Sequence, residues 1–238
     1  QVRNHDDPMR AHEVECFVRA LQTSPDRIAV LDLLQEQPSP ARLAATDVVL
    51  LGGSGHYSVA SETSLAEPAD DWLQRALDLL RDLKGQGQPT FASCWGFQAM
   101  ARALGGQVIH DASRAEVGTH ELYLTPEGRD DPVFGPLGDA FLGQMGHEDR
   151  VLELPAGATL LASADTVTNQ AYRLDRAPIY CTQFHPELNG ADLVRRLKAY
   201  PEYVRHLTGM STDEFAETIQ DSPQTEALLP RFVRHVLG

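Results

Sequence analysis

One cysteine in this sequence lies where a thiol would be both exposed and activated. Cys94 ends the apolar run "PTFASC", and the helical pattern "WGFQAMARALGG" follows at once. A sharp strand-to-helix turn exposes a side chain, and the positive end of the helix dipole favours a thiolate. The small residues Ala92 and Gly96 flank Cys94 at −2 and +2, as in a nucleophile elbow with cysteine in place of serine. The alternative is that Cys94 is a buried small hydrophobic residue, as most free cysteines are.

A cysteine nucleophile needs a base, and one of the nine histidines is placed to serve as one. His185 ends the apolar run "PIYCTQFH", where Pro186 interrupts strand pairing. Glu187 lies two residues after His185, on the same side of an extended chain, where its carboxylate can orient the imidazole. Cys94, His185 and Glu187 therefore form a candidate catalytic triad.

The elements that must position these residues alternate between strands and helices. In the first half we predict a helix at 8–22, strands at 27–34 and 47–55, a helix at 68–84 with Asp70 and Asp71 near its start, a strand at 89–94 and a helix at 95–106. In the second half we predict short strands at 116–125, 140–146, 158–165, 170–174 and 178–185, a helical segment at 190–208 and two further helices in 211–237.

This order favours one α/β domain with an open, mostly parallel sheet flanked by helices, in which some of the middle strands return antiparallel. The core is expected to span about residues 1–208, and a C-terminal helical extension about 209–238. If the sheet has a strand before the first helix, the opening residues "QVRN" supply only its tail.

Composition excludes several classes of function. The formal charge of −14 over 238 residues argues against nucleic acid or an anionic membrane as a partner. Three widely spaced cysteines and the lack of a signal-peptide core predict a reduced, cytoplasmic protein. No metal site is expected, because CxxC and HExxH are absent and His147, Glu148 and Asp149 cannot all face one ion. No cofactor is expected either, since "GGSGHYS" is not a P-loop. Cys16 and Cys181 are predicted to be buried.

Four motifs in order resemble the class I glutamine amidotransferases. They are small-x-Cys-x-Gly-x-Gln at 92–98, "QFHPE" at 183–187, "LLGGSG" at 50–55 in the place of a Gly-Gly-Pro oxyanion loop, and "MGHEDRVLELPAGATLLASAD" at 145–165. The strand "EVGTHELYLT" also matches the one that follows the elbow helix in that family. The resemblance covers about residues 27–190 and is strongest to the amidotransferase domain that accompanies GMP synthetase. It implies a flavodoxin-like class I fold.

The resemblance also implies a reaction. Cys94 would attack the carboxamide of glutamine to form a γ-glutamyl thioester, and His185, held by Glu187, would transfer the protons. The amides of Gly53 and Trp95 would form the oxyanion hole. Gln98, together with the backbone near Glu148 and Asp149, would help to bind glutamine. Glutamate and ammonia would be the products.

The sequence departs from the family pattern at several positions. Ala92 stands where the family has glycine, and Ser54 stands where it has proline. Gly146 replaces the serine before His147, and the bulky Trp95 and Phe97 replace smaller or polar neighbours of the cysteine.

Four functions remain open on these grounds. One is a cysteine-elbow hydrolase of another flavodoxin-like family, in which "FHPE" would have no purpose. A glutaminase would pass ammonia to a separate synthetase subunit, because only about 50 residues follow residue 190. A stand-alone enzyme would cleave γ-glutamyl peptides or conjugates, with Trp95 and Phe97 reshaping the pocket. A non-catalytic domain would bind a partner with a relic site, and the intact triad argues against it.

Overall fold

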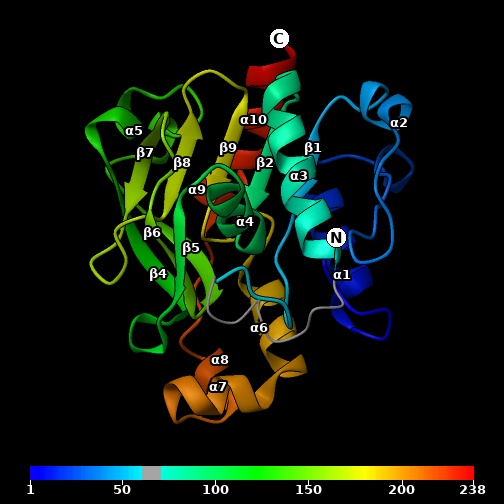
Figure 1. The fold of residues 1–238 in the computed structure, drawn as a ribbon. Coiled ribbons are helices and arrows are strands. Elements are labelled where there is room, and N and C mark those ends of the chain that lie inside the picture. Colours follow the sequence, from blue (N-terminus) through cyan, green and yellow to red (C-terminus); the bar gives the residue numbers. More distant parts are fainter. Residues whose placement is uncertain (61–70) are drawn as a thin grey trace.

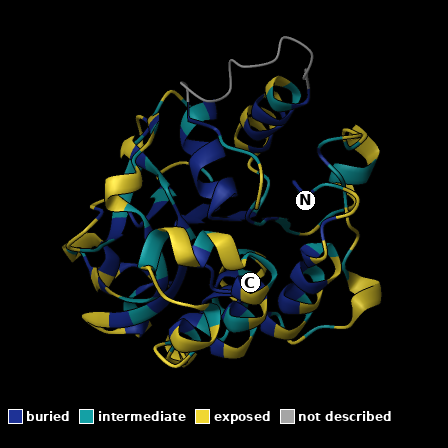
Figure 2. Ribbon diagram, turned by 90° about the horizontal axis from the view of Figure 1, so that it is seen from below, coloured by how far each residue is buried: buried dark blue, intermediate teal, exposed yellow. Residues whose placement is uncertain are grey.

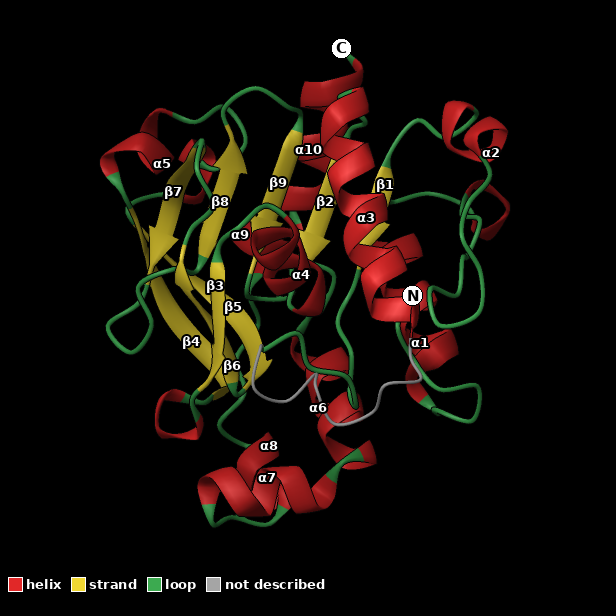
Figure 3. Ribbon diagram, viewed as in Figure 1, coloured by secondary structure: helices red, strands yellow, loops and turns green. Residues whose placement is uncertain are grey.

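The computed structural model describes residues 1–60 and 71–238. Its main sheet has seven strands, in the order β1 (Val49–Leu51), β2 (Thr90–Ser93), β9 (Ile179–Thr182), β8 (Ala171–Leu174), β7 (Ala158–Ser163), β4 (Glu116–Leu124) and β5 (Ala140–His147) (Figure 3). The pairs β1–β2 and β2–β9 are parallel, and the other neighbours are antiparallel. Five of these seven described strands therefore run in one direction, and the predicted α/β class is confirmed.

Helices cover both faces of the parallel half of the sheet (Figure 1). α3 (Asp71–Gln86) and α4 (Trp95–Ala103) pack on one face, and α1 (Met9–Ala20) and α10 (Leu228–Leu237) on the other. Because side chains alternate along a strand, Cys181 of β9 joins the first core and its neighbour Tyr180 the second. The inner sides of the helices are buried and their outer sides are exposed (Figure 2).

The parallel strands bring the candidate triad to one edge of the sheet. Ser93, the last residue of β2, pairs with Thr182, the last residue of β9. Cys94 and His185 therefore leave neighbouring strands on the same side. α6 (Gly190–Ala199), α7 (Pro201–Thr208) and α8 (Thr212–Ala216) lie beyond this edge, below the sheet in Figure 1.

The predicted strand at 27–34 is wrong. A short 3₁₀ turn, Pro25–Arg27, precedes a segment without strand structure, although "RIAVLDLL" has the residues of one. Residues 28–31 and β1 line a cavity of about 710 Å³, so this segment has no neighbouring strand to pair with. The segment makes two backbone hydrogen bonds with Gln1. The N-terminal ammonium of Gln1 donates to Leu31 O at 2.7 Å, and the amide of Leu33 donates to Gln1 O at 3.0 Å. A strand needs paired neighbours, and two contacts do not form one.

Other helices and strands differ in their bounds. The segment 190–208 is two helices rather than one, because Pro201 interrupts it and begins α7. The segment 211–237 contains three described helices, α8, α9 (Pro223–Glu226) and α10, instead of two. The sequence did not show the two-stranded sheet of β3 (Gln107–His110) and β6 (Asp149–Glu153), nor the short helices α2 (Pro40–Ala44) and α5 (Pro126–Asp130).

The C-terminal helix α10 packs into a hydrophobic core of the protein. Phe232 of α10 is fully buried, with its ring 5.3 Å from that of Phe91 in β2 and 5.6 Å from that of Tyr180 in β9. Burial of a phenylalanine contributes about 1.5–3 kcal/mol. The division into a core and an extension near residue 208 stays a prediction about domains. Asp70 lies outside the described residues, and α3 begins at Asp71. Of the helices in the described ranges, none combines the length and hydropathy needed to cross a membrane.

Candidate active site

Cys94 has the backbone conformation of a nucleophile elbow. It links β2 directly to α4 with φ 52° and ψ −105°, a region that residues with a side chain rarely adopt. Such a conformation persists only where its surroundings hold it. Here the amide of Cys94 donates to Thr182 O at 2.8 Å, and that of Gly96 donates to Gly52 O at 3.2 Å. The turn is thus fixed from both neighbouring strands.

The small residues around Cys94 are needed for packing, as the sequence predicted. A Cβ atom on Gly96 would lie 2.7 Å from Leu51 Cβ and 3.2 Å from Ala92 Cβ, closer than side chains normally approach. Ala92 is itself fully buried. The alanine in place of the family's glycine at this position is therefore accommodated, because Gly96 supplies the space.

His185 and Glu187 lie beside Cys94 and form a buried pair. His185 Nδ1 lies 2.7 Å from Glu187 Oε1, within the range of a short charge-assisted hydrogen bond. The other carboxylate oxygen accepts from the hydroxyl of Ser93 at 3.3 Å. The thiol of Cys94 lies on the same side of Gly53 as the imidazole, since a Cβ atom placed on Gly53 would lie 3.6 Å from Cys94 Sγ and 2.9 Å from His185 Cε1. The three residues predicted from the sequence therefore meet in one place.

The charges of this group place a proton on the imidazole. Burial alone would lower the pKa of His185, but the negative charges of Glu187 and Cys94 and their hydrogen bonds raise it to about 9. Burial would raise the pKa of Glu187, and His185 together with Arg196 instead holds it below its usual value. At neutral pH the pair is an imidazolium and a carboxylate.

Two arginines support the pair from outside the triad. Arg196 of α6 is buried, with Nη1 3.3 Å from His185 Nδ1 and 4.0 Å from Glu187 Oε1. Arg19 of α1 donates to the carbonyl oxygen of Glu187 at 2.7 Å. Neither arginine is marked by a motif in the sequence, because only the packing of α1 and α6 brings them to the triad.

Gly53 packs directly against the two reacting groups. A Cβ atom placed on Gly53 would lie 2.9 Å from His185 Cε1 and 3.6 Å from Cys94 Sγ. Trp95 is the first residue of α4, where a backbone amide has no acceptor within the helix. Both predicted oxyanion-hole residues therefore lie next to the thiol, and their role as donors stays a prediction. Ser54, which follows Gly53, accepts from the amide of Tyr57 at 3.0 Å and so closes this loop.

The residues predicted to bind glutamine have partners within the chain. Gln98 Nε2 donates to the carbonyl oxygen of Asp149 at 2.8 Å. The Asp149 carboxylate lies 2.9 Å from His110 Nδ1, and that of Glu148 lies 3.6 Å from His110 Nε2. These three residues are thus assembled around the start of β6, and Gln98 ties α4 to that strand. Their role in binding stays a prediction.

Tyr203 of α7 is a further residue near the site that the sequence did not reveal. Burial and the negative charges of Glu148, Cys94 and Asp149 raise its pKa. The helices beyond the sheet edge therefore bring an aromatic hydroxyl into electrostatic reach of the thiol. The sequence predicted only a helix here, and helical periodicity does not show which face meets a site.

Comparison with known proteins agrees with this geometry. The family model "Glutamine amidotransferase class-I" matches residues 9–193, which is more than half of the chain. The chain belongs to the class I glutamine amidotransferase family. The resemblance recognised in the sequence is thereby confirmed.

The curated relatives of this amidotransferase chain are glutamine-hydrolysing GMP synthases by name. A relative from Methanopyrus kandleri, named as one subunit of such a synthase, is 29% identical over 163 residues, which cover 66% of this chain and 77% of the relative. A GMP synthase of Nitratiruptor sp. is 32% identical over 127 residues, which cover 53% of this chain and 24% of the relative. The chain thus spans about a quarter of the length of the first curated relatives that it matches.

Solved structures share the fold of this amidotransferase chain. A glutamine amidotransferase of Thermotoga maritima superposes with a TM-score of 0.75 at 20% identity and covers 99% of this chain and 96% of its own. A protein of Thermoplasma acidophilum, described as a GMP synthase subunit, superposes with a TM-score of 0.64 at 18% identity, covering 99% and 93%. At this identity the likeness shows the fold alone.

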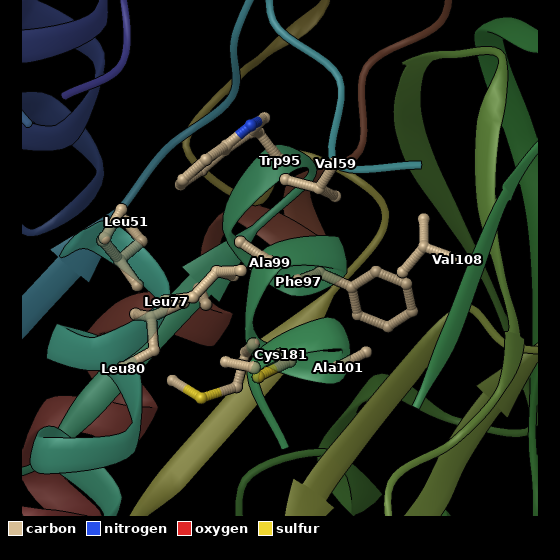
Figure 4. Close-up of a cluster of buried hydrophobic side chains, with 14 of the residues drawn as sticks. Leu51, Val59, Leu77, Leu80, Trp95, Phe97, Ala99, Ala101, Val108 and Cys181 are labelled. Carbon is tan, nitrogen blue, oxygen red and sulfur yellow. The ribbon is translucent and has the colours of Figure 1, made fainter. Parts of the chain in front are cut away.

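The two bulky neighbours of Cys94 do not reshape a pocket in this amidotransferase chain. Trp95 and Phe97 are buried in one hydrophobic cluster, in which the Phe97 ring points toward Val108 of β3 (Figure 4). The ring of Trp95 lies 6.1 Å from that of Trp72, and the ring of Phe97 lies 5.1 Å from that of Tyr172. The feature that suggested γ-glutamyl conjugates as substrates is therefore a packing feature.

Proposed function

We propose that this protein hydrolyses the side-chain amide of glutamine, with Cys94 as nucleophile, His185 as proton carrier and Glu187 as its positioning residue. One observation carries the proposal. An elbow cysteine at positive φ shares the surroundings of Gly53 with a buried imidazole, and Nδ1 of that imidazole lies 2.7 Å from a carboxylate. This is the arrangement that nucleophilic acyl transfer needs, with a nucleophile, a base and a group that orients the base.

The reaction would proceed in two halves. His185 takes the proton of the Cys94 thiol, and the sulfur attacks the amide carbon of glutamine. The resulting oxyanion accepts hydrogen bonds from the amides of Gly53 and Trp95. His185 donates its proton to the amide nitrogen, the carbon–nitrogen bond breaks, and ammonia leaves a γ-glutamyl thioester. Water then attacks the thioester while His185 takes a proton from it. The carbon–sulfur bond breaks and glutamate is released.

The protonation of the site supports this order of events. Since the pKa of His185 is raised to about 9, the imidazole already carries the proton that the leaving ammonia requires. Glu187 remains ionised and stabilises that imidazolium throughout. The buried position of both groups excludes water, which strengthens their interaction.

The test is release of glutamate from glutamine and, in parallel, from a γ-glutamyl dipeptide. We expect glutamine to be hydrolysed by the wild-type protein and not by Cys94→Ala, with Cys181→Ala as a matched control because Cys181 is buried in β9 away from the site. Preference for the dipeptide would identify a γ-glutamyl hydrolase. Equal rates in wild type and Cys94→Ala would overturn the proposal, and no activity in either would favour a non-catalytic domain.

We further propose that a separate synthetase subunit in the cytoplasm consumes the ammonia. The support is similarity to two proteins, each of which is named as one subunit of a GMP synthase. The aligned regions cover 77% and 68% of the length of these two relatives. The absence of disulfides among Cys16, Cys94 and Cys181 fits a reducing compartment. Mixing the protein with an ammonia-dependent synthetase from its own source should allow glutamine to replace ammonia as the nitrogen donor. If glutamine supports no product formation while ammonia does, the pairing is wrong.

A further inference from the structure

Three electron-rich side-chain atoms converge behind the triad, between α1 and α6. His12 and Cys16 are one helical turn apart on α1, and Asp192 belongs to the first turn of α6. His12 Nε2 lies 3.4 Å from Cys16 Sγ and 3.3 Å from Asp192 Oδ1, and the three atoms all lie within 4.8 Å of one another. His12 and Cys16 are buried, and Asp192 retains an exposed fraction of 16%.

One proton cannot satisfy this cluster. A proton on His12 Nε2 can be donated well to Asp192 or to the sulfur of Cys16, but not to both. If Nε2 is unprotonated, it accepts a hydrogen bond from the thiol of Cys16. Its contact with the carboxylate of Asp192 is then unfavourable, because both atoms are hydrogen-bond acceptors. A cation at the centre would satisfy all three atoms at once.

The distances fit a zinc ion. Zinc bonds of about 2.0–2.3 Å in a tetrahedron hold a nitrogen and an oxygen about 3.4 Å apart, and a nitrogen and a sulfur about 3.5 Å apart. The observed separations are 3.3 and 3.4 Å. Imidazole, thiolate and carboxylate are all ligands that zinc accepts, and a fourth position is left for water.

The surroundings hold the ligands in place. Arg19 pairs with the other oxygen of Asp192, Oδ2, so Oδ1 is turned toward His12. The same Oδ2 accepts from the amide of Asn189 at 3.2 Å in the capping box of α6, which fixes the carboxylate. The thiol of Cys16 would lose its proton on binding the metal.

We propose that His12, Cys16 and Asp192 form a zinc site that joins α1 to α6. The site does not include the thiol of Cys94 or the imidazole of His185. Arg19 of α1 contacts the backbone carbonyl oxygen of Glu187, and Arg196 of α6 contacts its carboxylate, so zinc bound here would join the two helices that hold Glu187.

The experiment measures binding of Zn²⁺ to the Cys94→Ala protein, because Cys94 and His185 are themselves a pair that could take up the ion. Affinity is measured by competition with a chromophoric chelator, and Co²⁺ is used as a spectroscopic probe for a thiolate ligand. Two further variants, Cys16→Ser and His12→Gln, are each made in the Cys94→Ala protein. Cys181→Ser is the control, because this cysteine is equally buried but lies in the core between β9 and α4.

We expect the Cys94→Ala protein and the control to bind one equivalent of Zn²⁺, with a thiolate charge-transfer band for Co²⁺ and a raised Tm. Cys16→Ser and His12→Gln should bind at least about tenfold more weakly. If Cys16→Ser does not fold, His12→Gln retains the thiol and decides the outcome. The proposal falls if the Cys94→Ala protein binds no Zn²⁺, or if the ligand variants bind it as tightly as the control does.

Discussion

Replacement of Gly53 by alanine tests whether the loop after β1 and the imidazole must be in close contact. The added Cβ would lie 2.9 Å from His185 Cε1, whereas an ordinary contact between carbon atoms is 3.4–4 Å. Either the loop or the ring must move by about 0.5–1 Å. The ring cannot move freely, because its Nδ1 lies 2.7 Å from Glu187 Oε1. The loop therefore moves away from Cys94, or the ring loses its alignment.

The expected cost is catalytic rather than structural. Misplacement of a reacting group by about 1 Å lowers a rate by about 100-fold, which corresponds to about 2.7 kcal/mol in the activation free energy. We therefore expect Gly53→Ala to lower kcat for glutamine hydrolysis by about 10- to 100-fold. The free energy of unfolding should change by less than about 1 kcal/mol, since Gly55 and His56 of the same loop are exposed and leave it room to shift.

The assay is steady-state glutamate release, with urea unfolding of the same samples. Gly85→Ala serves as the control, because a Cβ on this helical glycine meets no atom within 4 Å. It should leave kcat unchanged and stabilise α3 by up to about 1 kcal/mol. A kcat for Gly53→Ala within threefold of wild type would refute the view that this contact positions the imidazole.

Three further predictions concern the charges and the packing of the site. His185 has a pKa of about 9 against 6.5 in an unfolded chain, so its stabilising effect is complete below pH 6.5 and is lost as the pH rises through 9. Tm should fall over this window in wild type and less in Glu187→Gln, and equal slopes would contradict the pairing. Arg196→Gln removes a positive charge that lowers the pKa of Glu187. The acid limb of the pH profile of kcat/KM should therefore move to higher pH with KM unchanged. An acid limb that does not move would exclude Arg196 as a group that keeps Glu187 ionised. Gly96→Ala places a Cβ 2.7 Å from Leu51 Cβ and should lower the free energy of unfolding, measured in urea, by about 1–3 kcal/mol. A variant as stable as the wild type would show that the elbow has room for a side chain.

The triad could be predicted from the sequence because each member is marked locally. Cys94 and His185 both follow apolar strands, and parallel strands that pair end at the same edge of a sheet. The spacing of His185 and Glu187 needed only an extended chain. No long-range information beyond the pairing of β2 with β9 was required.

Features that depend on distant packing could not be predicted. The segment 27–34 has strand residues, but strand formation requires a partner, and a cavity separates this segment from β1. His110 has no partner in its own stretch of sequence and gains Asp149 only through the pairing of β3 with β6. Arg19 and Arg196 reach the triad because α1 and α6, which are far apart in the sequence, pack against each other.

The pairing of β2 with β9 positions the nucleophile and the base together. The amide of Cys94 donates to the carbonyl oxygen of Thr182, so the strained elbow is held by the strand that leads to His185. The hydroxyl of Ser93, the residue before the elbow, in turn donates to Glu187, two residues beyond the imidazole. Each strand thus supports the other strand's catalytic group. Because these contacts cross between strands, a shift of β9 relative to β2 would displace the elbow and the imidazole at once. The separation of sulfur and base therefore depends on sheet register as well as on the loop at Gly53.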